Sequence, residues 1–498
     1  MTLTLTMNTF AATNSKTQKS VRGAVSKNVL LPKSSPLVTF RIIFKTGSAS
    51  DPKGQEGVAA LTAAMLAQGG TRTLSYDQIV EAMYPMATSF GWQIDKELTV
   101  FKGTTHLDNL DHYYSLISGM LLDPGFRQED FTRLKTDAIN YLKNSLRGGN
   151  DEELGKEVLY NMIYAGGHAY GHQNRGTVSA LEALTVADVR DFYRKNYTQA
   201  NLLIGLAGGY PAPFPQKMES DFDKLPKGKE SSAKLPAPKL DAGTRVEIVK
   251  RETRSTAISL GFPINVTRAD KDWPALAVVA SYLGQHRSSN SYLYQRLREA
   301  RGLNYGDYAY IEYFPRGMFQ FEPDTNLARQ QQIFQIWIRP VEPRHGHFAL
   351  RAALYEYDKL LRDGMSREAF EATREFLGKY VNVLTQTQDA ELGYALDSRY
   401  YGIGNFNTYM REQLAKLTLE DVNRALRQYL KTDNMRIVII TKDADELRDA
   451  ITSNKPSPIT YNAPKPKEIT DEDKIIEGYK INVKPSDVTI VPVEQVFQ

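Results

Sequence analysis

Two pairs of histidines have spacings that could bind a metal ion. His168 and His172 stand four residues apart, and His345 and His347 lie in the run VEPRHGHFAL. Two imidazoles at i and i+4 of a helix can hold one zinc ion. Glycines surround the first pair and proline and glycine adjoin the second, so neither lies in a sequence that favours a helix. Neither pair has a glutamate placed to activate a metal-bound water. At most they predict a structural or adventitious metal site.

A second candidate is an arginine and a tyrosine in the run YLYQRLREARGLNYGDYAYIEYF. Arg298 and Tyr305 stand seven residues apart there. A guanidinium can donate two hydrogen bonds to a carbonyl or a carboxylate, and a phenol can donate one to an oxyanion. Without its flanking residues, Arg298 is equally compatible with a surface ion pair, and Tyr305 with a strand residue half-buried against a sheet. The run YIEYF at 310–314 fits an edge strand that adds a peptide, or an interior strand.

Other enzyme classes lack their motifs. The sequence contains no G-x-S-x-G nucleophile elbow, no P-loop and no dinucleotide fingerprint. It has no cysteine, which excludes disulfides, thiolate metal ligands and a cysteine nucleophile. The net charge of +4 is small for 498 residues, and no basic run is interleaved with aromatics, so nucleic acid is not expected as a partner. No apolar run reaches the roughly 18 residues that span a bilayer.

The elements that would position these groups form two similar halves. The segments LTVADVRDFYRKNYTQANLLIGLAG from Leu184 and LTLEDVNRALRQYLKTDNMRIVIIT from Leu417 share a Leu-Thr start and a helix. In both, an apolar strand opens at an asparagine, Asn201 or Asn434. At the front of each half, a strand, LVTFRIIFKTG or TAISLGFPIN, precedes a helix. This agreement in order and spacing predicts an internal repeat.

The order of elements in each half favours an α+β fold with two homologous repeats. Each half contains, in order, a strand, a helix, a strand pair, several helices and a closing strand. This order is typical of a mostly antiparallel sheet layered with helices. Residues 210–243 are rich in proline, lysine and serine, which predicts a linker. We expect a leader or disordered N-terminus at 1–28, domains at 29–209 and 244–446, and a C-terminal extension at 447–498 that packs across the domains.

The helix in the run GVAALTAAML resembles a zinc-binding helix that has lost its ligands. Taken alone, it is also ordinary core, because alanine and leucine favour helices. Together with the loop KTGSASDPKGQEG and the segment GGHAYGHQNRGTVSALEALTVADVRDFYRKNY, it resembles the insulinase/pitrilysin family of zinc peptidases over residues 29–446. In that family this helix carries His-x-x-Glu-His. The histidines fall on Ala60 and Ala64, and the glutamate on Ala63. A further glutamate ligand downstream falls on Tyr141. The resemblance therefore implies a degenerate zinc site and no metal in this chain.

The same resemblance implies a role for the arginine and tyrosine pair. In catalytically complete relatives, an Arg and a Tyr within a Leu-Arg-x-x-x-Gly-Leu-x-Tyr-like run reach the active chamber from the half opposite the zinc, and Arg298 and Tyr305 match them. The implied function is a non-catalytic subunit of a heteromeric zinc peptidase. Its partner would be the zinc-bearing chain, its substrate a peptide or unfolded protein, and it would be inactive alone.

Two alternatives stay open. One is a structural assembly subunit, like the peptidase-derived core proteins of respiratory complexes, and the other is a stand-alone peptide-binding protein. The opening run MTLTLTMNTFAATNSK contains no acid and ends near small residues, which resembles the later part of a secretory signal. It predicts a periplasmic or secreted protein. A mitochondrial or cytoplasmic location is the alternative.

Overall fold

The computed structural model describes residues 28–231, 234–320 and 322–498. The leader expected at 1–28 lies, except for Asn28, outside the described residues. In the described part, no helix is both long enough and apolar enough to cross a membrane.

The first half of the chain forms a five-stranded mixed sheet. Its strand order is β1-β5-β2-β4-β3; β1 runs parallel to β5, and the other neighbours are antiparallel. The strands are β1 (Val29–Pro32), β2 (Leu37–Phe44), β3 (Phe90–Ile94), β4 (Thr99–His106) and β5 (Leu202–Gly208). The helices are α1 (Val58–Gln68), α2 (Tyr76–Met83), α3 (Leu110–Leu122), α4 (Gln128–Asn140), α5 (Arg147–Gly149), α6 (Asp151–Ile163), α7 (Val178–Ala183), α8 (Val186–Asn196) and α9 (Phe214–Phe222).

The second half repeats this sheet and adds one strand. Its order is β11-β6-β10-β7-β9-β8, and the five strands from β6 to β8 have the same order and directions as the first sheet. The strands are β6 (Arg245–Lys250), β7 (Thr256–Ile264), β8 (Gly306–Tyr310), β9 (Gln332–Val341), β10 (Arg436–Thr441) and β11 (Val488–Pro492). The helices are α10 (Trp273–Gly284), α11 (Gly346–Asp363), α12 (Arg367–Leu384), α13 (Gln388–Tyr401), α14 (Phe406–Lys416), α15 (Leu419–Tyr429), α16 (Ala444–Thr452) and α17 (Lys467–Glu477). The predicted α+β fold with two repeats is confirmed.

Short helical turns complete the element list. Two are π-helical, η4 (Tyr141–Leu146) and η6 (Tyr294–Glu299). The 3₁₀ turns are η1 (Ser48–Ser50), η2 (Tyr84–Met86), η3 (Leu107–Asn109), η5 (Gln199–Asn201), η7 (Pro343–His345), η8 (Pro485–Asp487) and η9 (Val493–Gln495).

The repeated Leu-Thr signature is a pair of identical helix caps. The Thr185 side chain accepts a hydrogen bond from the Asp188 amide, and the Asp188 carboxylate accepts one from the Thr185 amide. Thr418 and Asp421 make the same reciprocal pair at the start of α15. Such a capping box satisfies two amides that a helix start would otherwise leave unpaired. The repeated Leu-Thr signature in the sequence therefore corresponds to the same capping box at the starts of α8 and α15.

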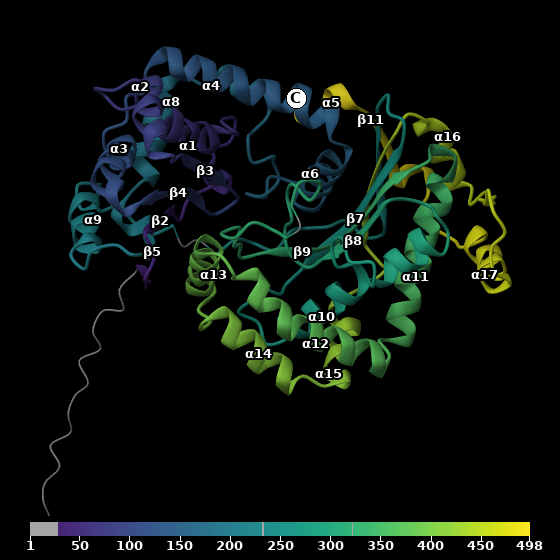
Figure 1. Cartoon of the computed structure of the whole chain (residues 1–498). Coiled ribbons are helices and arrows are strands. Elements are labelled where there is room, and N and C mark those ends of the chain that lie inside the picture. Colours follow the sequence, from purple (N-terminus) through teal and green to yellow (C-terminus); the bar gives the residue numbers. More distant parts are fainter. Residues whose placement is uncertain (1–27, 232–233, 321) are drawn as a thin grey trace, which may run out of the picture.

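In each half, one helix packs against the sheet of the other half. Helix α6 packs against β7 and β10, whereas α13 packs against β1, β2 and β5, and both lie between the two halves in Figure 1. Glycines permit this close approach. A Cβ on Gly155 would stand 2.7 Å from the Ser259 hydroxyl oxygen, and one on Gly205 would stand 2.7 Å from a Leu396 methyl carbon. Neither sheet is thus covered by its own half alone.

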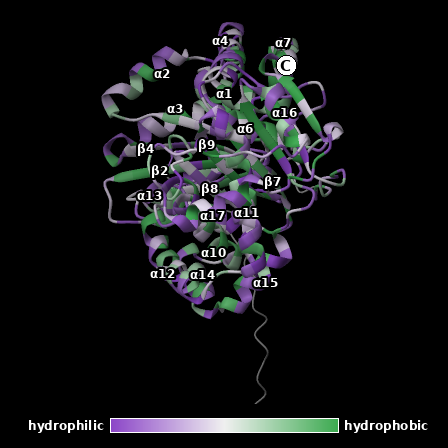
Figure 2. Ribbon diagram, turned by 90° about the vertical axis from the view of Figure 1, so that its right-hand side faces the viewer, coloured by the Kyte–Doolittle hydropathy of each residue, from purple (hydrophilic) through white to green (hydrophobic). Residues whose placement is uncertain are grey.

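The C-terminal segment also joins the halves. Strand β11 pairs in parallel with β6, and the chain then returns to the first half, where the C-terminus lies beside α5 in Figure 1. Arg147 Nε donates to the Val496 carbonyl at 2.6 Å, and the Val178 amide donates to the Phe497 carbonyl at 3.0 Å. Figure 2 shows hydrophobic residues along the central strands and hydrophilic residues on much of the outer helices.

A buried ion pair connects the two halves at their centre. Arg329, in the connection between β8 and β9, donates from Nε to Asp95 Oδ2 at 2.6 Å, just beyond β3. Both side chains are almost completely buried. The guanidinium also lies 3.9 Å from the Tyr313 ring centroid. Burial alone would lower the pKa of Arg329, but the Asp95 carboxylate overcomes this and holds that pKa above its usual value.

Replacing Arg329 should destabilise the chain strongly. Arg329→Met leaves Asp95 buried without its cation, so we expect the free energy of unfolding to fall by about 3 to 5 kcal/mol in urea denaturation. Arg344→Met is the matched control, because the Arg344–Glu342 pair is exposed, and it should cost at most about 1 kcal/mol. Equal losses for the two variants would contradict a central role for the buried pair. The double variant Arg329→Met/Asp95→Leu should recover part of the loss, since no charge is then left unpaired.

Candidate functional site

Asp51 fixes the start of helix α1. Its carboxylate accepts hydrogen bonds from the Gly57 amide at 2.7 Å and the Ala59 amide at 2.8 Å, and it lies 3.1 Å from His172 Nε2. Burial raises the pKa of Asp51, while His172 opposes that shift. Gly57 has φ of 103°, and a Cβ there would stand 2.5 Å from the Arg175 carbonyl oxygen. The helix start is therefore fastened to the segment around residues 172–176.

The four predicted zinc positions carry no zinc donor set. Ala60, Ala63 and Ala64 are buried on α1 at 4%, 0% and 6% exposure. Tyr141 begins η4, and burial raises its pKa to about 12, so its phenol stays protonated at neutral pH. Three methyl groups and a neutral phenol do not fit zinc, which needs imidazole, carboxylate or thiolate donors. Across the described ranges, no cluster of three or more His, Asp or Glu side chains is arranged to hold a metal ion.

A guanidinium stands against Tyr141. The Arg175 guanidinium carbon lies 4.0 Å from the Tyr141 ring centroid and 5.7 Å from that of Trp92 on β3. These three residues line one side of a cavity of about 380 Å³, and residues of the β8–β9 connection such as Arg316 and Asp324 line the other. The cavity therefore lies between the two halves. Sequence reasoning missed Arg175, although it stands in the segment GGHAYGHQNRGT that carried part of the family resemblance.

Arg298 and Tyr305 lie together on the second half. Arg298 Nη1 donates to the Tyr305 carbonyl at 3.2 Å, and its guanidinium carbon lies 4.4 Å from the Tyr305 ring centroid and 4.6 Å from that of Tyr294. Arg298 Nε also forms an ion pair with Glu299 Oε1 at 3.9 Å, as the surface ion-pair interpretation expects. Tyr305 is 65% exposed, so it is not a residue half-buried against a sheet. The structure brings this pair together at η6 and the residue before β8, whereas the four degenerate positions lie on α1 and η4 of the first half.

A buried carboxyl group lies beside this pair. Asp307 on β8 is 1% exposed, Asn304 donates to its Oδ1, and its Oδ2 has no hydrogen-bond partner in the described part. Burial raises the pKa of Asp307 to about 8, with Asn304 and Arg298 acting in the opposite direction. At neutral pH this carboxyl is mostly protonated and does not cancel the charge of Arg298. Periodicity could not reveal it, because its burial depends on the packing of β8.

The run around Tyr310 is at a sheet edge. Strand β8 covers Gly306–Tyr310 and, among the described strands, pairs with β9 alone, so Tyr310 ends an edge strand and not an interior one. Residues 311–314 lie beyond the strand and begin the connection to β9.

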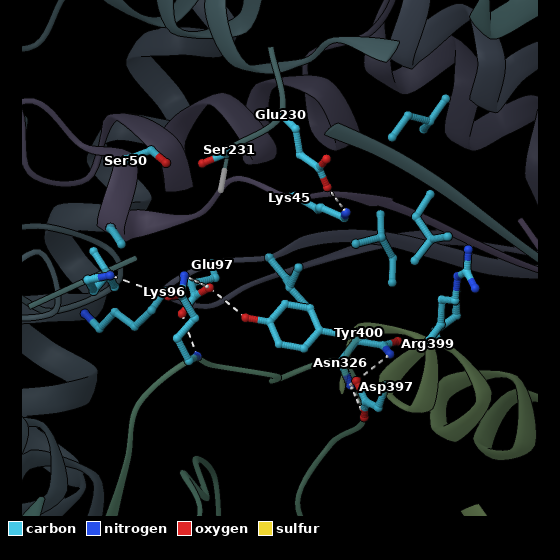
Figure 3. A pocket seen from close by; sticks show the side chains of 18 residues that line it. Lys45, Ser50, Lys96, Glu97, Glu230, Ser231, Asn326, Asp397, Arg399 and Tyr400 are labelled. Atoms are coloured by element: carbon cyan, nitrogen blue, oxygen red, sulfur yellow. Dashed lines mark hydrogen bonds and ion pairs between the residues drawn. The ribbon is translucent and has the colours of Figure 1, made fainter. Parts of the chain in front are cut away.

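A second cavity, of about 500 Å³, lies between the first sheet and α13 (Figure 3). Its polar groups largely satisfy one another. Lys45 pairs with Glu230, the Tyr400 hydroxyl donates to Glu97 at 2.6 Å, and the Asn326 side chain donates to Asp397 at 3.0 Å. Because these groups pair with one another, we interpret this cavity as part of the contact between the halves and not as a reactive site.

Comparisons with known proteins identify the family. Residues 28–166 match the family described as Insulinase (Peptidase family M16), and residues 183–377 match the Peptidase M16 inactive domain. The chain belongs to peptidase family M16. An uncharacterized zinc protease of Streptomyces coelicolor is 34% identical over 162 residues, which are 31% of this chain and 35% of that protein. This chain thus spans about a third of that relative's length.

Other similar proteins, at lower identity, match over a larger share of the chain. Subunit 2 of the mitochondrial cytochrome b-c1 complex of Saccharomyces cerevisiae is 23% identical over 57% of this chain and 71% of that protein. The solved structure of a peptidase M16 inactive domain from Pseudomonas fluorescens superposes with a TM-score of 0.72 at 22% identity, covering 83% of this chain and 94% of that one. At this identity the superposition shows the M16 fold alone.

The buried carboxyl of Asp307 makes stability depend on pH. Its pKa is about 8 when folded and about 3.9 when unfolded, so the stability it contributes is fully present below about pH 4 and is lost as pH rises toward 8. Asp307→Asn keeps an acceptor for Asn304 but cannot ionise. We expect the melting temperature of Asp307→Asn minus that of the parent to be about 2 °C or more higher at pH 8 than at pH 5. Asp363→Asn, at an exposed carboxylate, is the control. Parallel curves for Asp307→Asn and the parent would show that Asp307 does not titrate in this range.

Proposed function

We propose that this chain is the non-catalytic subunit of a heteromeric M16 peptidase and that it presents Arg298 and Tyr305 to a peptide held by a zinc-bearing partner. One contrast carries the proposal. The positions that hold zinc in active relatives are Ala60, Ala63, Ala64 and Tyr141, whereas the half-buried Arg298 and the exposed Tyr305 are both present and in contact. A chain that had become only a scaffold would have no use for a half-buried arginine held against two tyrosine rings.

The local packing prepares Arg298 to bind an oxygen atom of a substrate. Rings of Tyr294 and Tyr305 flank the guanidinium, which limits its motion without neutralising its charge. Asp307 is mostly uncharged at neutral pH, and the ion pair of Arg298 with the exposed Glu299 is long, at 3.9 Å between Nε and Oε1. The guanidinium can therefore donate to a carbonyl or oxyanion, and the exposed Tyr305 phenol can donate beside it.

The partner and the substrate follow from what this chain lacks and offers. A zinc-bearing M16 chain would complete the catalytic site, and the heterodimer would enclose an extended peptide or unfolded segment. Edge strand β8, next to Tyr305, offers backbone groups to such a segment. We further propose that the chain is exported to the periplasm or secreted, on the basis of its acid-free opening run. Fractionation of the source cells tests this location.

A structural assembly role is the second candidate. The observation that favours it is the similarity to subunit 2 of the yeast cytochrome b-c1 complex, a component of a larger assembly. This role predicts a stable complex without peptidase activity. A stand-alone peptide-binding protein would bind peptide without recruiting any partner.

The deciding experiment isolates the partner and measures activity. The tagged chain is purified from its native extract, and the recovered complex is assayed on a fluorogenic peptide with and without a zinc chelator. A co-purifying chain with His-x-x-Glu-His and chelator-sensitive cleavage supports the heteromeric peptidase. Recovery of a large complex without cleavage supports the assembly role instead.

Arg298→Ala should lower activity of the reconstituted complex. Loss of one donor to a developing oxyanion typically costs about a hundredfold in rate, so we expect that decrease in kcat/KM with complex formation unchanged. Arg362→Ala, at an exposed arginine beside Asp363, is the matched control and should leave the rate unaltered. Full activity of the Arg298→Ala complex would refute a role in trans for this side chain.

A further inference from the structure

The guanidinium of Arg175 has no anionic partner. Within the described part of the chain, none of its guanidinium nitrogens makes a hydrogen bond or an ion pair, and its contacts are with the rings of Tyr141 and Trp92. The side chain is half-buried and lines the cavity of about 380 Å³ between the halves. A buried or half-buried arginine ordinarily pairs with a carboxylate. This arginine therefore offers its donors to the cavity.

Lys102 adds a second cation to the same cavity. It lies on β4, opposite Gly91 of β3, and no ion pair or hydrogen bond of its ammonium is found among the described residues. Burial and the charge of Arg41 lower the pKa of Lys102, with Asp324 and Asp389 opposing at longer range. Two cations from neighbouring strands and loops thus border one space.

The acids that line the cavity are already engaged. Glu153 pairs with the buried Lys156, and Asp324 pairs with Arg316. Glu157 accepts a hydrogen bond from the Tyr313 hydroxyl at 2.6 Å, and burial raises its pKa. The cavity lining holds as many acidic as basic side chains, and each of these acids has a hydrogen-bond or ion-pair partner other than Arg175. The unoccupied donors of Arg175, more than the net charge of the lining, favour an anionic ligand.

We propose that Arg175, assisted by Lys102, binds a peptide carboxylate in the cavity beside Tyr141. The planar guanidinium matches a carboxylate in a two-bond fork, and its contact with the Tyr141 ring, 4.0 Å from the guanidinium carbon to the centroid, uses none of its hydrogen-bond donors. The carboxylate belongs either to the C-terminus of a peptide or to an acidic side chain, which share this chemistry. That the ligand is a peptide rests on the proposed function; the preference for a carboxylate rests on the cavity alone.

Binding of matched peptides to the purified full chain, without any partner, tests this site. The first probe is the hexapeptide acetyl-Ala-Ala-Phe-Ala-Leu-Ala with a free C-terminal carboxylate, and the second is the same peptide as its amide. A third, amidated peptide carries one internal glutamate. Dissociation constants come from calorimetry, and quenching of Trp92 fluorescence reports the place of binding, with Trp92→Phe as the reference for that signal.

The expected result is selectivity for the charged peptide. A charge-assisted pair should make the acid bind at least about tenfold more tightly than the amide, and added salt should reduce that ratio. Tight binding of the glutamate peptide as well would identify any carboxylate as the ligand, whereas its absence would assign the site to the C-terminus. Equal affinity of the acid and both amides, or no binding at all, would overturn the proposal.

Variants separate this charge effect from folding. Arg175→Gln should reduce the ratio of acid to amide affinity to about one, Arg175→Lys should keep part of it, and Lys102→Gln should lower it about threefold. Arg194→Gln, at an exposed arginine on α8, is the matched control and should not change it. A ratio that persists in both Arg175→Gln and Lys102→Gln would refute the site. Because the assay needs no partner, a failure of heteromeric activity would leave its result unaffected.

Discussion

The arrangement of the molecule depends on one buried ion pair between its halves. Arg329 reaches from the β8–β9 connection to Asp95, and Asn174 donates to the same carboxylate at 3.0 Å. Asp95 thus holds together the end of β3, the connection from the second half and the segment that leads into Arg175. An uncompensated charge at this depth would cost several kcal/mol, so the two halves are constrained to one relative position. The cavity beside Tyr141 exists because of that constraint.

The exchange of helices reinforces the same constraint. Because α6 covers the second sheet and α13 covers the first, separating the halves would expose an apolar face of each sheet. Arg41 on β2 adds a polar tie, since its guanidinium donates to the Asp389 carboxylate of α13 at 2.9 and 2.6 Å. A molecule interlocked in this way is suited to hold binding groups of both halves at fixed positions, as two halves around one substrate require.

The sequence predicted what local physical chemistry determines. The two capping boxes, at Thr185 and Thr418, use side-chain to backbone bonds within four residues, so spacing alone revealed the repeat and the α+β order. The alanines of α1 could be recognised in the same way, because a zinc helix has a fixed spacing of donors. The role of Arg298 and Tyr305 in trans remains a prediction.

The sequence did not reveal features that arise only from packing. Nothing in the period of α6 shows that its apolar face meets the sheet of the other half. From the sequence, Asp307 is indistinguishable from an exposed carboxylate at the edge of a strand, although it is buried in the fold. Arg175 is likewise indistinguishable from a surface arginine, although its guanidinium contacts the rings of Tyr141 and Trp92. Each of these depends on residues far apart in the chain, and the pairings of such residues leave no signal in a single sequence.

In both candidate binding groups, an arginine side chain contacts aromatic rings. Arg298 and Arg175 each lie over aromatic rings. In the described residues Arg175 has no carboxylate partner, and Arg298 has the long ion pair with the exposed Glu299. A carboxylate would hold a guanidinium in place but would also cancel its charge and occupy its donors. An aromatic face orients the guanidinium through its π electrons and leaves both the charge and the N–H edges available. A chain without zinc donors can thus still bind the anionic and carbonyl oxygens of a peptide, which is the contribution that a non-catalytic subunit would make to a shared site.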